Sequence, residues 1–205
     1  MFFYILLGHM KKWLIVLTVF VSGTALTQDL AASFPTAQSF VPEANQSFYL
    51  DLDTAEGAFS QWRHDDISSV SALRAVVRVP ILRKDRKWLP GFAIWLQKTE
   101  AGEIKNRVGV QLVAPDKKPP LMIRLVQYDG KNLVHTESSS TTIGLDQNLA
   151  IEIVWVKPHT VTIKIGDAEI HNLSIGWSVN SVGVTASTGQ MKVDPLVLGN
   201  SHENP

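Results

Sequence analysis

The sequence contains no cysteine and no excess of either charge. Without cysteine there is no disulfide framework, no thiol nucleophile, no cysteine-ligated metal and no lipid-modified amino-terminal cysteine. The 19 basic residues equal the 19 acidic residues, so the formal net charge is zero. A nucleic-acid-binding protein would carry a basic surplus, and we therefore expect no nucleic-acid partner.

The chain also lacks an apolar run long enough to cross a bilayer, which needs about 20 residues. Its amino-terminal run, Trp13–Val21, follows Lys11–Lys12 and precedes the small residues Ser22–Ala25. This order is typical of a secretory signal peptide, and an uncleaved anchor is the alternative. We predict a signal peptide over residues 1–27, with Met10 as the initiator, and a secreted or periplasmic protein with no stable membrane anchor after cleavage.

What the sequence has in abundance is alternation of apolar and polar residues. It is clearest from Ala150 to Gly199, where Ile151, Ile153 and Trp155 form one apolar series. A period of two predicts strands with one buried face, so Trp155 is expected in the core. Glycine-containing turns separate the segments, which indicates short antiparallel strands.

Similar alternation precedes this region, and Asp129–Gly130 is a strong hairpin signal. One segment is ambiguous, because Ile67, Val70, Leu73 and Val77 fit a helical face, but the valine-rich alternation that follows favours a strand over 72–82. Further strands are expected at 47–53, 59–63, 92–97, 107–112, 121–126 and 132–137, with 138–142 as a polar connection.

The total of eleven or twelve strands, without a convincing long helix, predicts an all-β fold of two stacked antiparallel sheets. This sandwich domain is expected over residues 47–200. A linker or irregular first strand over 28–46 precedes it, and a tail over 201–205 follows.

Three places make the chain resemble the concanavalin A-like lectin/glucanase superfamily, which includes laminin-G-like jelly rolls. They are the strand pair Ile151–Trp155 and Val161–Gly166, the segment Val182–Gly189 with its Ser-Thr-Gly turn, and the last strand, Lys192–Gly199. In the family this last strand returns to pair near the first. The resemblance covers Ser47 to Asn200 and implies a jelly-roll sandwich with one concave, ligand-binding sheet.

No catalytic motif accompanies this resemblance. The Glu-x-Asp-x-Glu strand of the family's glucanases is missing, as are a Gly-x-Ser-x-Gly elbow and a phosphate-binding glycine loop. The nearest carboxylate alternation, Asp51 and Asp53, is interpreted as a pair of surface residues. The histidines show no metal-ligand spacing. We expect no catalytic residue, no cofactor and no metal, although the scattered ligands of a laminin-G-type calcium site would leave no sequence signature.

The remaining signal is a set of polar and aromatic residues at outward positions of the middle strands. An aromatic face stacks on sugar rings, and guanidinium and amide groups bond to hydroxyls or acidic sugars. The alternative is an ordinary polar sheet surface with cross-strand pairs. The candidate ligand-binding residues are Trp95, Arg78, Arg74, Gln97, Arg107, Gln111 and Arg124.

The sequence therefore predicts an exported, non-catalytic module that binds a glycan or polysaccharide on its concave sheet. Two alternatives remain open. One is an envelope domain that contacts protein partners or has a structural role, for which an exposed apolar patch would be the sign. The other is a glycoside hydrolase or lyase with a non-standard active site.

Overall fold

The computed structural model describes residues 46–67, 69–156, 160–167 and 169–200. The predicted signal peptide and tail, and the linker up to residue 45, lie outside this range. The described residues form twelve strands and no helix. In that part of the chain, no helix has the length and apolarity needed to cross a membrane. The strands are β1 (Gln46–Asp53), β2 (Phe59–Asp65), β3 (Ala72–Leu82), β4 (Gly91–Glu100), β5 (Glu103–Val113), β6 (Leu121–Asp129), β7 (Asn132–Ile143), β8 (Leu149–Val156), β9 (Thr160–Ile165), β10 (Glu169–Ser174), β11 (Ser181–Ser187) and β12 (Gly189–Gly199).

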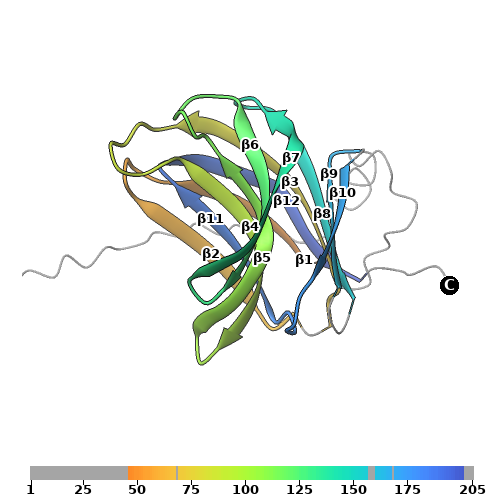
Figure 1. Cartoon of the computed structure of the whole chain (residues 1–205). Helices are drawn as coiled ribbons and strands as arrows, with labels where there is room; N and C mark the ends of the chain where they lie inside the picture. The colour runs from red at the N-terminus through yellow and green to blue at the C-terminus, as the bar shows by residue number, and fades with distance from the viewer. Residues whose placement is uncertain (1–45, 68, 157–159, 168, 201–205) are drawn as a thin grey trace, which may run out of the picture.

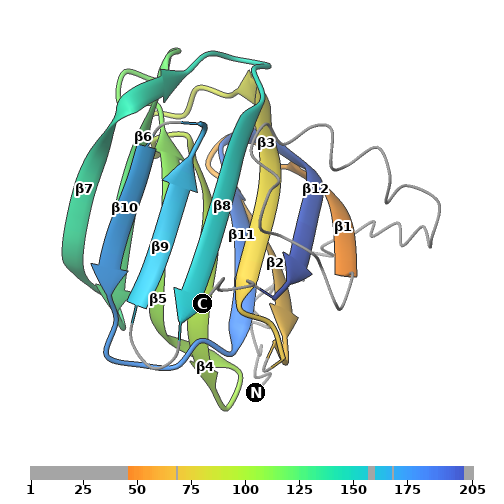
Figure 2. The same cartoon turned by 90° about the vertical axis from the view of Figure 1, so that its right-hand side faces the viewer.

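The strands build two six-stranded antiparallel sheets. Sheet A has the order β1-β12-β3-β8-β9-β10, which Figure 2 shows from its outer side. Sheet B has the order β2-β11-β4-β5-β6-β7 and lies behind it. This confirms the predicted all-β jelly-roll sandwich. The last strand pairs along the first, from Gln46 opposite Leu198 to Asp53 opposite Gln190, as the resemblance implied.

The core lies between the inner faces of the sheets. Phe92, Ile94 and Leu96 of β4 point into it from sheet B, and Ile151 and Ile153 of β8 from sheet A, all essentially without solvent exposure. Alternate residues of a strand occupy one face, so the period of two maps directly onto this core.

Three tryptophans contribute to the same core. Trp155 is buried, as predicted, and Trp62 and Trp177 also lie in the core, whereas Trp88 is 60% exposed. Proximity to a turn therefore says little about the exposure of a tryptophan in this fold.

The prediction for 72–82 is confirmed, because β3 spans Ala72–Leu82. The prediction of a polar connection over 138–142 is wrong, because β7 continues to Ile143. The strand β7 is an edge strand and pairs only with β6 within sheet B. An edge strand needs little apolar character, and a run of serines and threonines can therefore extend it.

Sheet B is curved. In Figure 1 the middle strands β4, β5 and β6 bow toward sheet A at their centres, which leaves the outer face of sheet B on the concave side. The side chains that point outward from these three strands therefore converge on a common surface.

Candidate ligand-binding face

Five of the seven candidate residues share the outer face of sheet B. The β4–β5 register places Gln97 opposite Arg107, and Arg107 lies opposite Tyr128 of β6. Two same-face rows further along the strands, Gln111 lies opposite Arg124, and Trp95, opposite Gly109, lies in the row between. We call this surface, defined by Trp95, Gln97, Arg107, Gln111, Arg124 and Tyr128, the B face.

The expectation that Arg74 and Arg78 belong to the same face is wrong. Both lie on β3, which is inserted between β12 and β8 in sheet A. Arg74 is buried and forms an ion pair with Glu152 at 2.9 Å, and Arg78 pairs with Asp146 at 3.5 Å. Alternation shows which side chains share a face of one strand, but it does not show which sheet the strand joins.

Trp95 lies on the B face but is only 3% exposed. Its neighbours across the strands are Gly109 and Gly183, which have no side chains to hold the indole away from the sheet. The indole N–H donates to Thr185 Oγ1 at 3.0 Å, and the ring meets Tyr128 edge-on at a centroid distance of 6.1 Å. The expected exposed stacking platform is therefore a covered ring, and Tyr128, which the sequence did not single out, is the more accessible aromatic group.

Arg107 covers both aromatic rings. Its guanidinium carbon lies 4.7 Å from the centroid of Trp95 and 4.4 Å from that of Tyr128. Among the described residues no carboxylate forms an ion pair with it, and its buried Nε has no hydrogen-bond partner. Burial lowers the pKa of the Arg107 guanidinium, while the neighbouring Tyr128 acts in the opposite sense. The B face thus holds a partly desolvated cation whose hydrogen-bonding capacity is not used within the described chain.

Gln97 lies next to Arg107 and has no solvent exposure. Its Oε1 accepts a long hydrogen bond from Ser181 Oγ at 3.4 Å, and its buried Nε2 has no partner in the described structure. A Cβ on Gly183 would lie 2.6 Å from this Nε2, so glycine at that position makes room for the amide. A buried amide nitrogen without a partner is costly, and its position beside Arg107 concentrates unused donors in one place.

Gln111 and Arg124 complete the face toward the other end of the strands. Both side chains are half-buried, and the described residues provide neither of them with a hydrogen bond or an ion pair. Ser138 of β7 lies opposite Arg124 and adds a hydroxyl at the edge of the sheet. The face therefore offers guanidinium, amide and hydroxyl groups over a small aromatic cluster.

The two aspartates that alternate on β1 are surface residues. Asp51 accepts a hydrogen bond from Gln190 at 2.7 Å and lies 3.5 Å from Lys192, and Asp53 pairs with Arg83. Both carboxylates are exposed on sheet A, away from the B face. They do not flank a shared substrate position with the B-face residues.

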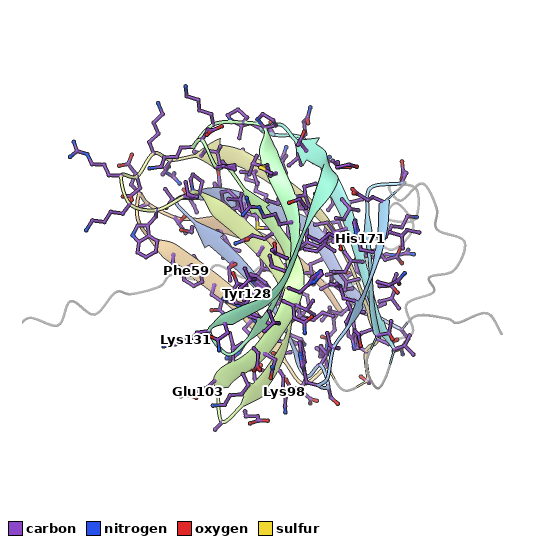
Figure 3. The ribbon with its side chains drawn as sticks, viewed as in Figure 1. Phe59, Lys98, Glu103, Tyr128, Lys131 and His171 are labelled. Carbon is purple, nitrogen blue, oxygen red and sulfur yellow. The ribbon has the colours of Figure 1, made fainter. Side chains whose placement is uncertain are left out.

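A second polar cluster joins the edges of the two sheets, where β7 and β10 lie side by side (Figure 2), and Figure 3 labels one member, His171. His171 Nδ1 lies 3.0 Å from Glu137 Oε1, and Glu169 accepts hydrogen bonds from the Ser139 hydroxyl and, at 3.0 Å, from the Ser140 amide. The Ser139 hydroxyl is the main cause that lowers the pKa of Glu169 to about 2, followed by the Ser140 amide, the Thr141 side chain and then His171.

Sequence reasoning missed this cluster, because its members are about 30 positions apart and one strand had been interpreted as a connection. Among the described residues, no group of three or more metal-ligating side chains is arranged to hold a metal ion. The observed contacts connect one sheet edge to the other.

Comparison with known proteins gives matches in structure but not in sequence. No protein-family model and no curated protein matches the chain. Among solved structures, the galectin LEC-6 of Caenorhabditis elegans matches with 12% identity and a TM-score of 0.48, over 74% of this chain and 96% of that one. The legume lectin-like domain from Entamoeba histolytica matches with 14% identity and a TM-score of 0.49, over 80% and 88%. The Emp46p carbohydrate recognition domain in its metal-free form matches with 12% identity and a TM-score of 0.49, over 79% and 85%.

Proposed function

We propose that the protein is a non-catalytic carbohydrate-binding module, and that its B face binds an acidic sugar. The observation that carries this proposal is the Arg107 guanidinium, which is half-buried against Trp95 and Tyr128 and has no carboxylate partner among the described residues. A carboxylate on a sugar ring would supply the missing acceptor. Bonds between a guanidinium and a carboxylate are short and directional, and they favour a planar acid over a neutral hydroxyl.

The neighbouring groups fit a sugar that extends along the sheet. The half-buried Gln111 and Arg124 can bond to hydroxyls or a second acidic group, and the partly exposed Tyr128 adds an aromatic ring beside Arg107. Trp95 has a supporting role in this proposal, because its ring is covered and its N–H is already bonded to Thr185. The ligand then contacts Arg107 and Tyr128 rather than the indole.

Binding without catalysis is proposed because two carboxylates at the rim of sheet B already have partners. Asp65 pairs with Arg63 at 3.0 Å, and Asp129 accepts a hydrogen bond from Asn106 at 3.0 Å. Glycoside hydrolysis by the common mechanism needs two carboxyl groups on either side of the bond. A site built from arginine, glutamine and tyrosine is suited to holding a sugar.

Titration calorimetry with acidic and neutral oligosaccharides tests the proposal. We expect uronic-acid oligosaccharides to bind and neutral gluco-oligosaccharides to bind weakly or not at all. Arg107→Gln should weaken binding by about 10- to 100-fold, the range for a lost charged hydrogen bond. Arg107→Lys should recover only part of it, because lysine lacks the planar fork.

Arg78→Gln is the matched control, because it removes an arginine from sheet A, outside the B face. The Arg78→Gln variant should bind uronic-acid oligosaccharides with an affinity near that of the wild type. Equal losses in both variants, or unchanged binding in Arg107→Gln, would refute the assignment of the site. Thermal denaturation of each variant separates lost binding from lost folding.

Export is part of the proposed function. It rests on the basic, apolar and small-residue order of residues 11–25. Expression of the full chain in a bacterium, followed by mass measurement of the recovered protein, tests it. A product shortened near Ala25 and found outside the cytoplasm supports export, and a full-length cytoplasmic product contradicts it.

A further inference from the structure

Two loops meet at one end of the sandwich. Residues 83–90 connect β3 to β4, and residues 114–120 connect β5 to β6. Lys117 Nζ donates to the backbone carbonyls of Asp85 and Arg86, and the Ala114 amide donates to the Pro90 carbonyl at 3.2 Å. Figure 1 shows these connections at the upper end of the molecule, opposite the β4–β5 and β6–β7 turns. We call them together the basic end.

The basic end has a local positive charge, although the chain as a whole has a net charge of zero. The first loop has four basic residues against one acidic residue and the second has two against one, a net charge of +4 in a chain whose total is zero. Arg83 pairs with Asp53, and Lys117 donates to the first loop, but four exposed cations form no salt bridge among the described residues. They are Lys84, Arg86, Lys87 and Lys118.

The single acid of the first loop is used to shape it. Asp85 Oδ1 accepts the backbone amides of Lys87 and Trp88, each at 2.7 Å. The Trp88 and Lys87 amides are the main causes that lower the pKa of Asp85. These hydrogen bonds fix the turn, so Asp85 stabilises the loop conformation in which Trp88 and Leu89 are exposed to solvent.

These two exposed residues are large and apolar. Trp88 is 60% exposed and Leu89 is 47% exposed, at consecutive positions beside three cations. A Cβ placed on Gly57 would lie 3.6 Å from Trp88 Cδ1, so the turn before β2 borders the tryptophan, and Phe59 at the start of β2 is 60% exposed as well. Figure 3 shows Phe59 on the same side of the molecule as these loops. Large apolar side chains such as Trp88 and Leu89, exposed beside several cations, are unusual on a surface that has no binding partner.

The chemistry of this end selects one partner. Tryptophan is favoured at the boundary between lipid headgroups and acyl chains, and lysine and arginine are drawn to anionic headgroups. Lysine is depleted in protein–protein interfaces, so a surface rich in exposed lysines favours lipid over a protein partner. We propose that the basic end docks peripherally on an anionic lipid surface, with Trp88 and Leu89 inserted at the headgroup level and Lys84, Arg86, Lys87 and Lys118 on the headgroups. This contact is separate from the B face and independent of sugar binding.

Co-sedimentation with vesicles tests the proposal. The wild-type protein should bind vesicles of phosphatidylcholine with phosphatidylglycerol, bind pure phosphatidylcholine much more weakly, and dissociate at high salt. Each basic side chain near such a surface contributes about fivefold to partitioning, so the triple variant K84E/R86E/K87E should lose on the order of 100-fold. Trp88→Ala should lose about tenfold and should abolish a blue shift of the fluorescence on binding.

The matched control is K98E/K105E/K131E, which makes the same charge change at the other end of the molecule, where Figure 3 shows Lys98 and Lys131. It should bind anionic vesicles within a fewfold of the wild type. Equal loss in the two triple variants would overturn the proposal, because net charge alone would then explain binding. Binding to heparin but not to anionic vesicles would overturn it too, in favour of a soluble polyanion. Neither triple variant substitutes a residue of the B face, and the sugar-binding test uses only the single variants at Arg107 and Arg78, so failure here leaves that test unaffected.

Discussion

The two outer faces of the sandwich use similar residues in opposite ways. On sheet A the polar side chains find partners on the next strand: Arg74 with Glu152 at 2.9 Å, and Thr162 with Asn172 at 2.8 Å. On sheet B, Arg107 lies over aromatic rings without an ion-pair partner among the described residues. Arg74 of sheet A meets a carboxylate, whereas Arg107 of sheet B keeps donors available, and this difference locates the proposed binding surface better than residue type does.

The backbones of the two sheets differ as well. In sheet A, glycine occurs only at the two ends of β12, whereas sheet B has Gly109 and Gly183 inside β5 and β11. Glycine inside a strand weakens it and marks a close approach of other groups. Here the two glycines flank Trp95. Their missing side chains leave space for the indole and, at Gly183, for the Gln97 amide.

The largest effect is expected from Gly109→Ala, which tests whether the B face depends on this glycine. The added Cβ would lie 2.0 Å from the Ile94 carbonyl oxygen, a backbone atom that cannot move without separating β4 from β5. We expect a loss of about 3 kcal/mol in the free energy of unfolding, measured by denaturant titration. Alanine at Gly102, where no atom lies within 4 Å of the added Cβ but φ is +81°, provides a comparison for backbone strain without a clash. A Gly109→Ala protein as stable as the wild type would show that the strands separate more easily than we infer.

The next prediction compares how much Arg74 of sheet A and Arg107 of sheet B contribute to stability. Arg74→Met removes a buried ion pair and leaves Glu152 without it, so we expect a loss of about 2 kcal/mol in stability. Arg107→Met removes a cation without a carboxylate partner. The loss of its contacts with the aromatic rings and the relief of its desolvation should nearly cancel, so we expect the free energy of unfolding to change by about 1 kcal/mol or less. Chemical denaturation of both variants measures this difference. If Arg107→Met is the more damaging, Arg107 is a structural residue, and the comparison between the two faces fails.

A smaller effect on stability is expected from Glu169 of β10, which bonds to Ser139 and Ser140 of β7 and so joins the edges of the two sheets. The pKa of Glu169 is about 2 when folded, below its usual 4.5, so its charged form stabilises the fold above pH 4.5 and this contribution is lost as the pH falls toward 2. The wild type should therefore lose more stability on acidification through this range than Glu169→Gln, by on the order of 1 kcal/mol or less because water screens the site. Melting temperatures across the acid range measure it, with Glu137→Gln as a neighbouring control. Parallel pH profiles for the wild type and Glu169→Gln would contradict the lowered pKa.

The smallest effect is expected at the rim of sheet A. Asp53→Asn breaks the ion pair with Arg83, in which the aspartate side chain is about half exposed. Exposed pairs contribute about 0.5 kcal/mol or less, so thermal denaturation should show little change. A large loss would mean that the exposed charges of sheet A matter as much as the buried Arg74 pair.

Much of the fold could be predicted from particular strands. The valine-rich alternation of 72–82 and the apolar series Ile151, Ile153 and Trp155 gave the correct strands and the correct inner faces. The serine- and threonine-rich end of β7 was interpreted as a connection, because an edge strand paired on one side carries little apolar signal.

The candidate site was only partly predictable. Trp95, Gln97, Arg107, Gln111 and Arg124 were placed correctly on one face, because β4, β5 and β6 follow each other as hairpins. Arg74 and Arg78 were misplaced, because the chain crosses to the other sheet between β3 and β4. Tyr128 was overlooked, and only the register shows that it lies opposite Arg107.

The sequence by itself determined the strands and their buried sides, because the alternation of a strand is a local property that follows from backbone geometry. Only the tertiary structure decided which strands share a sheet, which arginine meets a carboxylate and which lies over aromatic rings. Those outcomes depend on pairings between residues far apart in the chain, and no local pattern encodes them.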